Sequence, residues 1–474
     1  MSDELTELDA TAQAELVRAG EVTSVELVDA AIERIEALDP TVNAVIHTRF
    51  DEARAEAAEV NPGATAPFAG VPFLLKDIGA TQAGLPYWMG NVALKAADTR
   101  LAHDTVLGAR FRDAGLITLG KTNLPELGST PTTQPRSCGP TNNPWDLSRS
   151  PAGSSGGSGA AVASRMVPIA HANDGGGSTR LPAAWCGLVG LKTTRGRIPA
   201  PDTISRLLSE LVVSRSVRDT ARVLDAVAGP TPADLFQARL PARPYVDEVG
   251  APVEGLRVGV LASAGTLEVD AECAAAARAA AAWLEEQGHD VVEVDDEVLF
   301  GGDARVNGRL WMAGLTQRVD ALGTLLGRPL TEDEVEPFNW AAAERGRSVT
   351  VTEWVDGQER QHAWCRTVIE WFADVDLLVT PTAGCPPLTT AELEPPAGTP
   401  WKAGRTHALI GAFTLPFNAT GQPAISVPLG ETAAGLPVGV QLVAGMERED
   451  LLLRVAAQFE EAMPWGQRRP LAID

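Results

Sequence analysis

The hydrophobic residues of this chain follow helical spacing in some segments and form short continuous runs in others. Over residues 24–39 they recur every three or four positions, which predicts an amphipathic helix with Ser24 as N-cap and its end just before Pro40. Over residues 71–75 they are almost continuous, which favours a strand buried on both faces. Helices and buried strands in one chain indicate an α/β protein.

The same two patterns predict further elements. Helices are expected over 51–60, 105–114, 271–287 and 449–463. Strands are expected over 115–120, 188–192, 256–261, 290–294, 377–381, 418–430 and 438–443, the last two at the end of a sheet. The helix at 271–287 lies between two predicted strands, so this segment predicts a βαβ unit. The proline-rich residues 229–255 are expected to form a long surface connection.

Two glycine-serine clusters, at residues 153–159 and 175–178, interrupt these elements. The apolar run between them can cross a core as a helix followed by a strand. Repeated glycine supplies no side chain for packing, so each cluster predicts a sharp bend or a close approach of backbone to a ligand. Consecutive backbone N–H groups in the second cluster can point at one oxygen and form an oxyanion hole. These groups belong to Gly175, Gly176, Gly177 and Ser178.

Lys76 ends the apolar run that begins at residue 71, so its side chain is expected to be at least partly buried. Burial disfavours the ammonium form and makes lysine a usable base near neutral pH. A serine nucleophile needs such a proton acceptor, because no histidine lies in a recognisable catalytic context, and a second serine can relay the proton. The alternative is a lysine that pairs with the adjacent Asp77.

Two known sequence motifs match this chain, but the neighbouring residues do not favour the structures that these motifs require. Residues 115–122 satisfy the P-loop pattern, yet the residues between its glycines favour a sheet over an exposed phosphate-binding loop. Residues 153–157 satisfy the G-x-S-x-G pattern of the α/β-hydrolases, which requires an acid and a histidine downstream. That interpretation gives the second glycine cluster no role, so we favour neither motif.

Net charge limits the partners of this chain. It has 39 basic and 62 acidic residues, and its formal charge of −23 should repel nucleic-acid phosphates and anionic membrane surfaces. No apolar run is long enough to cross a bilayer, and the acidic N-terminus lacks the pattern of a secretory signal. Lysine is scarce among the basic residues, which makes each one worth examining. The lysines are Lys76, Lys95, Lys121, Lys192 and Lys402.

The five cysteines are widely spaced and include no C-x-x-C pair. This spacing argues against a disulfide framework and against a structural zinc site. We therefore expect a reduced, cytoplasmic protein. A metal or another cofactor is not expected either.

Residues 300–372 differ in character from the rest of the chain. They contain five of the 11 tryptophans, among charged helical segments with little strand signal. Such a region can cover a site and line a pocket. The alternative is that the tryptophans form the aromatic core of a helical layer.

Six motifs, in their order along the chain, resemble the amidase signature family. They are GVPFLLKD at 70–77, GKTN at 120–123, NPW at 143–145, SSGGS at 154–158, GGGSTR at 175–180 and NATGQPAISVPLG at 418–430. The resemblance covers essentially the whole chain. It implies an α/β fold with a central mixed β-sheet covered by helices on both faces. It further implies one large domain over residues 1–474, with a signature core at about 65–200 and a helical, Trp-rich region over the pocket at about 300–372.

The resemblance also implies the chemistry. In the family, the lysine of the first motif, the first serine of SSGGS and the serine of GGS form a Ser-cisSer-Lys triad. They match Lys76, Ser154 and Ser178, and the two serines are 24 positions apart, as in the family. Ser178 is then the nucleophile, and Ser154 relays the proton of Ser178 to neutral Lys76. The resemblance also implies that the peptide bond before Ser154 is cis.

Three further residues are expected to support this triad: Ser155, Asp174 and Arg180. One departure from the family pattern lies beside them, because many members have GTD before the glycine cluster. This chain has Ala172, Asn173 and Asp174 there. The departure can alter the support of the oxyanion loop, but it removes no member of the triad.

An amidohydrolase that cleaves small carboxylic amides through an acyl-enzyme follows from the resemblance. Residues 9–22, 327–336 and 449–458 also resemble nylon-oligomer amidases of the family, which makes 6-aminohexanoate cyclic dimer and related oligomers candidate substrates. The alternatives are the glutaminase subunit of a tRNA-dependent amidotransferase, an aryl-acylamidase or esterase, and a non-enzymatic binding protein. The family resemblance makes a homodimer the assembly to expect.

Overall fold

One mixed β-sheet organises the computed structural model of this chain, which describes residues 2–199, 207–301, 304–394 and 398–473. Within these residues the sheet has 11 strands in the spatial order β1-β3-β2-β4-β6-β5-β10-β11-β9-β7-β8. β2 pairs in parallel with β3 and β4, and β7 with β8 and β9, whereas the other neighbours are antiparallel. The expected mixed sheet is therefore confirmed. The strands are β1 (Val45–Thr48), β2 (Pro72–Lys76), β3 (Ile117–Thr122), β4 (Ile169–Asp174), β5 (Val189–Lys192), β6 (Ser209–Ser214), β7 (Arg257–Val260), β8 (Asp290–Glu293), β9 (Leu377–Pro381), β10 (Ala424–Glu431) and β11 (Pro437–Ala444).

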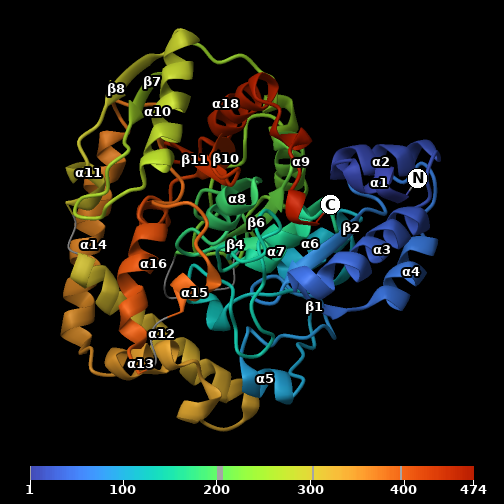
Figure 1. The fold of residues 1–474 in the computed structure, drawn as a ribbon, viewed down its shortest axis with the longest axis horizontal. Coiled ribbons are helices and arrows are strands. Elements are labelled where there is room, and N and C mark those ends of the chain that lie inside the picture. Colours follow the sequence, from blue (N-terminus) through green and yellow to red (C-terminus); the bar gives the residue numbers. More distant parts are fainter. Residues whose placement is uncertain (1, 200–206, 302–303, 395–397, 474) are drawn as a thin grey trace.

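Eighteen α-helices of the described residues surround this sheet (Figure 1). They are α1 (Ser2–Glu7), α2 (Ala10–Ala19), α3 (Ser24–Val42), α4 (Phe50–Ala58), α5 (Val92–Ala96), α6 (Val106–Asp113), α7 (Gly156–Ala163), α8 (Arg180–Cys186), α9 (Val217–Val227), α10 (Ala271–Glu286), α11 (Glu297–Phe300), α12 (Ala304–Leu326), α13 (Pro337–Gly346), α14 (Val351–Trp371), α15 (Thr390–Leu393), α16 (Gly404–Ile410), α17 (Leu415–Thr420) and α18 (Glu449–Ala462). Helices α1–α4 gather at the right of Figure 1, and α11 and α14 lie at its left. α10 joins the parallel neighbours β7 and β8, which confirms the predicted βαβ unit.

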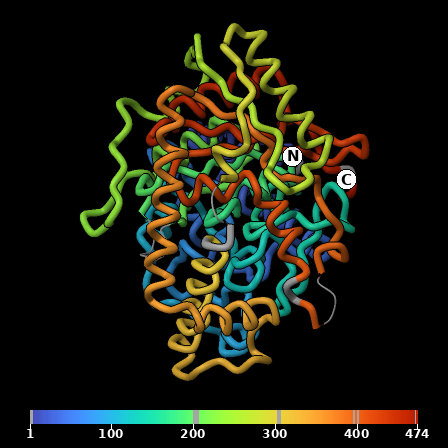
Figure 2. Tube along the Cα trace, turned by 90° about the vertical axis from the view of Figure 1, so that its left-hand side faces the viewer, coloured from blue at the N-terminus to red at the C-terminus, as the bar shows by residue number. Residues whose placement is uncertain are grey.

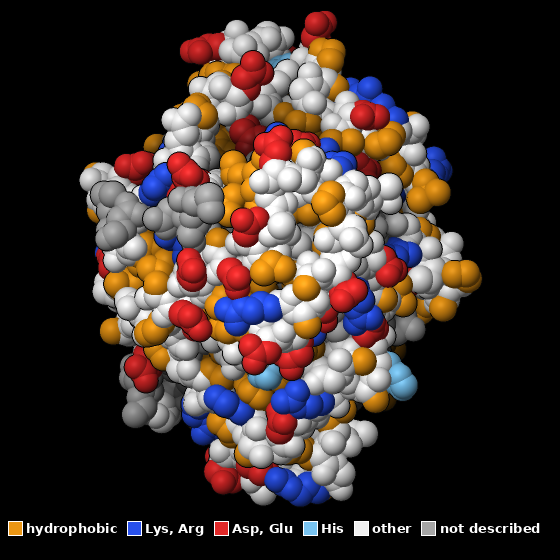
Figure 3. All heavy atoms as spheres, turned by 90° about the vertical axis from the view of Figure 1, so that its right-hand side faces the viewer, with side chains coloured by type: hydrophobic (Ala, Val, Ile, Leu, Met, Phe, Trp, Pro, Cys, Tyr) orange, Lys and Arg blue, Asp and Glu red, His pale blue; other side chains and the backbone are white. Residues whose placement is uncertain are grey.

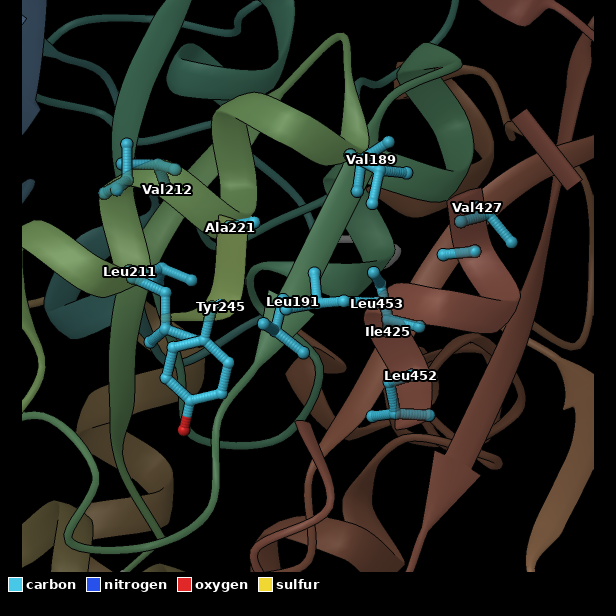
Figure 4. Close-up of a cluster of buried hydrophobic side chains, with 14 of the residues drawn as sticks. Val189, Leu191, Leu211, Val212, Ala221, Tyr245, Ile425, Val427, Leu452 and Leu453 are labelled. Carbon is cyan, nitrogen blue, oxygen red and sulfur yellow. The ribbon is translucent and has the colours of Figure 1, made fainter. Parts of the chain in front are cut away.

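Helices cover both faces of the sheet, so a hydrophobic core forms on each face. α6, α9, α10 and α18 pack on one face, where Figure 4 shows Leu191 of β5, Ile425 of β10 and Leu452 of α18 close together. α3, α4, α7 and α8 pack on the other face. Successive strand residues point to opposite faces, so Leu75 joins the first core and Leu74 the second. Full burial of each such leucine contributes about 1.5–3 kcal/mol to stability.

Helix α3 begins and ends differently from the prediction. Its N-cap is Thr23, which forms a capping box with Glu26, so Ser24 is already helical. Pro40 lies inside the last turn of α3 rather than beyond it. Pro40 has no N–H to donate to the carbonyl four residues earlier, and the helix stops soon after it at Asn43, which adopts the left-handed conformation.

The C-terminal strands also differ from the prediction. Residues 418–420 belong to α17, and the strand starts only at Ala424, after Gly421 caps the helix and Pro423 follows. β10 and β11 lie inside the sheet between β5 and β9, not at its end. Their antiparallel pairing joins the two halves of the sheet, a relationship that local periodicity does not encode.

The region at residues 300–372 is helical, as expected, with α12, α13 and α14 as its main elements. α14 runs along the outside of the molecule (Figure 2). Trp311 and Trp340 pack against one hydrophobic cluster, and Trp364 and Trp371 against another, which agrees with the alternative of an aromatic core. Residues 302–303 of this region, and residue 200 at the end of the expected signature core, lie outside the described residues.

The molecular surface agrees with the acidic composition. Figure 3 shows acidic and basic side chains interspersed over one face rather than gathered into a basic patch. Among the helices of the described residues, none combines the length and apolar character needed to cross a membrane.

Candidate active site

The carboxyl ends of β2 and β4 meet at one edge of the sheet, where the candidate site is built. The two strands are parallel neighbours, so Lys76 at the end of β2 lies beside the end of β4. Helix α7 packs against both strands. The turn before α7 carries Ser154 and Ser155 to the same edge.

Lys76 is completely buried, and its Nζ contacts three polar groups. It lies 2.6 Å from Ser154 Oγ, 2.8 Å from Ser155 Oγ and 2.6 Å from Asn173 Oδ1. None of these partners carries a charge. Burial therefore dominates and lowers the pKa of Lys76 to about 7, although more distant carboxylates oppose it. A lysine with this pKa is present in comparable amounts as amine and ammonium near neutral pH, so it can act as a base.

The first glycine cluster holds the expected relay serine. The Gly153–Ser154 peptide bond is cis, as the family resemblance implies. Ser154 is buried with 2% exposure. A Cβ at Gly157 would collide with the backbone of Asn123, so only glycine lets the two segments approach. The close approach predicted for this cluster is therefore to the protein's own backbone rather than to a ligand. This contact positions helix α7, which follows Ser155.

The second glycine cluster holds the expected nucleophile and touches the first. The Ser155 backbone N–H donates to the Ser178 carbonyl oxygen at 3.2 Å. Ser178 is partly exposed, in contrast to the buried Lys76 and Ser154, so a substrate can reach it. A Cβ at Gly175 would meet nothing within 4 Å, which leaves this side of the loop open.

Three backbone amides of this loop are free to bind an oxyanion. Those of Gly175, Gly176 and Ser178 have no hydrogen-bond partner within the part of the chain that the structure describes. The amide of Gly177 instead donates to Asp174 Oδ1 at 2.6 Å. Gly177 has φ +126°, a conformation that other residues rarely adopt. The expected set of four amides is therefore reduced to three in this structure.

A buried ion pair between Asp174 and Arg180, which we call the clamp, contacts the loop of residues 175–178. Asp174 ends β4, and its carboxylate accepts Nε and Nη2 of Arg180, both at 2.9 Å. It also accepts the backbone amides of Gly177 and Thr179 and the side-chain amide of Asn418. Burial alone would raise the pKa of Asp174, but the Arg180 charge and these hydrogen bonds hold it well below its ordinary value.

Arg180 also binds three residues that the sequence did not single out: Thr414, Asn418 and Gln441. Arg180 donates to Thr414 O at 3.0 Å, to Gln441 Oε1 at 2.7 Å and to Asn418 Oδ1 at 2.6 Å. Thr414 Oγ1 also donates to Gly176 O at 2.7 Å, so it touches the oxyanion loop directly. Asn418 opens one of the quoted motifs, and that motif was the only signal for it. No local pattern marks Gln441, which is one buried position of β11.

Asp77 does not pair with Lys76. Its carboxylate accepts the backbone amide of Trp88 at 3.1 Å and lies 3.8 Å from Lys121, which is also fully buried. Burial raises the pKa of Asp77 and lowers that of Lys121. The alternative of a Lys76–Asp77 pair is therefore wrong. In the part of the chain that the structure describes, no three His, Cys, Asp or Glu side chains are placed to hold a metal ion.

Known proteins match this chain over nearly its whole length. A family model described as Amidase matches residues 26–453. The chain is 45% identical over 484 residues to the 6-aminohexanoate-cyclic-dimer hydrolase of Paenarthrobacter ureafaciens, covering 98% of this chain and 97% of that protein. It is 35% identical over 475 residues to an acylamidase of Rhodococcus erythropolis, with the same coverage. A solved structure of a 6-aminohexanoate cyclic dimer hydrolase superimposes with a TM-score of 0.93, at 43% identity and 99% coverage of both chains.

Proposed function

The chain belongs to the amidase family of amide-bond hydrolases, and from this premise we propose that it cleaves small carboxylic amides through an acyl-enzyme on Ser178. Ser154 is the proposed proton relay and Lys76 the proposed base. The observation that carries the proposal is the 2.6 Å contact between Lys76 Nζ and Ser154 Oγ, both buried.

In the acylation step, Ser178 Oγ attacks the carbonyl carbon of the amide. Its proton passes to Ser154 Oγ, and the proton of Ser154 passes to neutral Lys76 Nζ. The carbonyl oxygen becomes an oxyanion, which the free amides of Gly175, Gly176 and Ser178 stabilise. The buried clamp behind the loop keeps these donors in place before the charge develops.

Collapse of the tetrahedral intermediate breaks the carbon–nitrogen bond. Protonated Lys76 returns a proton through Ser154 to the leaving nitrogen, and the amine departs. Water then attacks the acyl ester, and its proton passes by the same route to Lys76. Collapse of this second intermediate breaks the ester bond, Lys76 returns the proton through Ser154 to Ser178 Oγ, and the carboxylic acid is released.

The proposed substrates are 6-aminohexanoate cyclic dimer and related oligomers. The support is the 45% identity, over nearly the full length, to a hydrolase named for the cyclic dimer. For the cyclic dimer, one turnover opens the ring at a single amide bond. We also expect a cytoplasmic homodimer, and five unpaired cysteines support a reducing compartment.

The test ranks amides by kcat/KM. We expect the cyclic dimer to exceed the linear dimer, indole-3-acetamide, an anilide and glutamine. Glutamine as the preferred substrate would move the assignment to an amidotransferase subunit, and a preferred anilide would move it to an aryl-acylamidase.

The nucleophile is tested separately with Ser178→Ala. This variant should lose about 10⁴-fold or more of kcat/KM while it keeps the fold, because the members of a catalytic triad act as a unit. It should also resist covalent labelling by a fluorophosphonate, which the wild-type protein should accept. Ser158→Ala is a matched control, since Ser158 Oγ bonds Thr122 and the His171 carbonyl and no triad member. Wild-type turnover by Ser178→Ala would overturn the proposal.

A further inference from the structure

Lys76 has one polar neighbour that the proposed triad does not use. Asn173 stands at the position where the chain departs from the family's GTD sequence, and its Oδ1 lies 2.6 Å from Lys76 Nζ. This contact is as short as the one to Ser154. The orientation of the Asn173 amide is fixed, because Nδ2 donates at 3.3 Å to the Ile78 carbonyl, which can only accept.

The hydroxyl of Ser155 is also committed. Ser155 Oγ donates to the backbone carbonyl of Asn173 and accepts the backbone N–H of Asn173, both at 3.3 Å. A hydroxyl has one proton and two lone pairs. Its remaining contact, at 2.8 Å to Lys76 Nζ, must therefore use a lone pair of Ser155 and an N–H of Lys76.

These two acceptors determine the orientation of the amine. A neutral amine has two N–H donors and one lone pair, and Asn173 Oδ1 and Ser155 Oγ each take one donor. The lone pair is left for the hydroxyl proton of Ser154. When Lys76 is protonated, its third N–H replaces the lone pair and points at Ser154 Oγ. One proton between Lys76 and Ser154 is then the only difference between the two states.

We propose that Asn173 is a positioning residue, which accepts one N–H of Lys76 and thereby turns the lone pair of the amine toward Ser154. The inference rests on the proposed function, because the orientation matters only if Lys76 is the base. Without Asn173, Ser155 is the one fixed acceptor left to Lys76 among the residues that the structure describes, and the amine can rotate about its Cε–Nζ bond away from Ser154. A misdirected base costs rate without costing substrate affinity.

The charged groups around this cluster come from two strands. Glu210 of β6 lies next to Asn173, since a Cβ at Gly79 would meet both side chains. Glu210 pairs with His171 at 3.3 Å, and burial lowers the pKa of His171. Asp174 of β4 belongs to the clamp. These charged groups are the same in the wild type and in the Asn173 variants. A difference in midpoint between these proteins therefore reflects the side chain at position 173.

The experiment measures the rate of fluorophosphonate labelling of Ser178 against pH, which needs no knowledge of the substrate. The wild-type rate should rise with pH through a midpoint near 7, as Lys76 loses its proton. Asn173→Asp should move the midpoint up by about 1–3 pH units, because an adjacent carboxylate favours the ammonium form. Asn173→Ala should move it down by about 0.5–1 unit, because the lost acceptor also favoured that form.

The labelling plateau and steady-state kinetics complete the test. Asn173→Ala should lower the plateau rate and kcat by about 10–100-fold with KM nearly unchanged, as expected for a displaced base. A merely structural residue would lower the melting temperature and leave the midpoint at its wild-type value. Ser158→Ala is the control for such a loss of buried hydrogen bonding.

The outcomes separate the inference from the proposed function. Opposite midpoint shifts in Asn173→Asp and Asn173→Ala support the inference. If the midpoint and the plateau rate of Asn173→Ala equal those of the wild type, the inference is overturned. This holds even if Asn173→Asp fails to fold. Labelling of Ser178→Ala at the wild-type rate would instead overturn the proposed function itself.

Discussion

Two basic side chains, Lys76 and Arg180, are buried near the loop of residues 175–178, and their neighbours differ in charge. Lys76 faces two hydroxyls and an amide oxygen, and burial lowers its pKa to about 7. Arg180 faces the carboxylate of Asp174 through two hydrogen bonds of 2.9 Å. The Arg180 charge and the hydrogen bonds around it hold the pKa of Asp174 well below its ordinary value, so this carboxylate stays ionised.

The difference between these regions shows what burial does to a base. Next to neutral groups, burial makes the protonated and neutral forms of Lys76 similar in free energy, so the side chain can carry a proton. Next to an opposite charge, burial makes the loss of either partner costly, so the Arg180–Asp174 pair holds the loop in place. The proposed mechanism needs both, because Ser178 must lose its proton and the loop that carries it must not move.

The largest expected effect is the loss of activity when Lys76 is replaced. Lys76→Met should lower kcat/KM by about 10⁴-fold or more, since it removes one member of a triad that acts as a unit. Its fold should persist, because an apolar side chain of similar length replaces a group that burial disfavours. Steady-state kinetics and urea unfolding measure the two quantities on the same preparation.

Lys192→Met is the matched control for this prediction. Lys192 is also buried, burial lowers its pKa to about 7, and its Nζ donates to Thr193 O at 2.9 Å rather than to a triad member. This variant should retain most of its activity. Equal loss of activity in both variants would contradict the distinct role of Lys76.

Breaking the clamp should have a smaller effect on activity, and the free energy of unfolding should fall first. Arg180→Met should lower the free energy of unfolding by about 3–5 kcal/mol, because it leaves the Asp174 carboxylate buried without its counter-charge. Urea unfolding measures the loss, and activity should fall with it as the loop loosens. Adding Asp174→Asn removes the unpaired charge and should recover part of the stability. No recovery in the double variant would show that the ion pair is not what holds the loop.

Counted per pH unit, the smallest expected effect is in the pH dependence of stability. The folded pKa of Lys76, about 7, lies below its unfolded value of roughly 10.4, so between these values the unfolded chain binds one more proton. This group alone makes the free energy of unfolding rise by about 1.4 kcal/mol per pH unit as pH increases through that window.

The slope should be lower by this amount in Lys76→Met, measured by urea unfolding between neutral and alkaline pH. The clamp acts in another window: the folded pKa of Asp174 is depressed, so its contribution is present above the unfolded pKa of roughly 3.9 and lost as pH falls further. Equal alkaline slopes in wild type and Lys76→Met would mean that Lys76 keeps its ordinary pKa in the folded protein.

Much of the fold could be predicted from local pattern. The strand expected over 377–381 is β9 at the same residues, and the expected βαβ unit is present. The order of strands could not be predicted, because β10 and β11 insert between β5 and β9 through pairings between distant segments. Pro40 and Asn418 were placed wrongly because a helix end depends on caps and on tertiary packing as well as on periodicity.

The sequence by itself determined which chemical groups this protein has to work with: two glycine-serine clusters, and a lysine at the end of an apolar strand. Only the tertiary structure decided what these groups do. It brought Asn173 to Lys76 across 97 positions of chain, surrounded that lysine with neutral acceptors, and gave the amide of Gly177 to Asp174. The physical reason is that a pKa and a hydrogen bond depend on distances and burial, which exist only after the chain has folded.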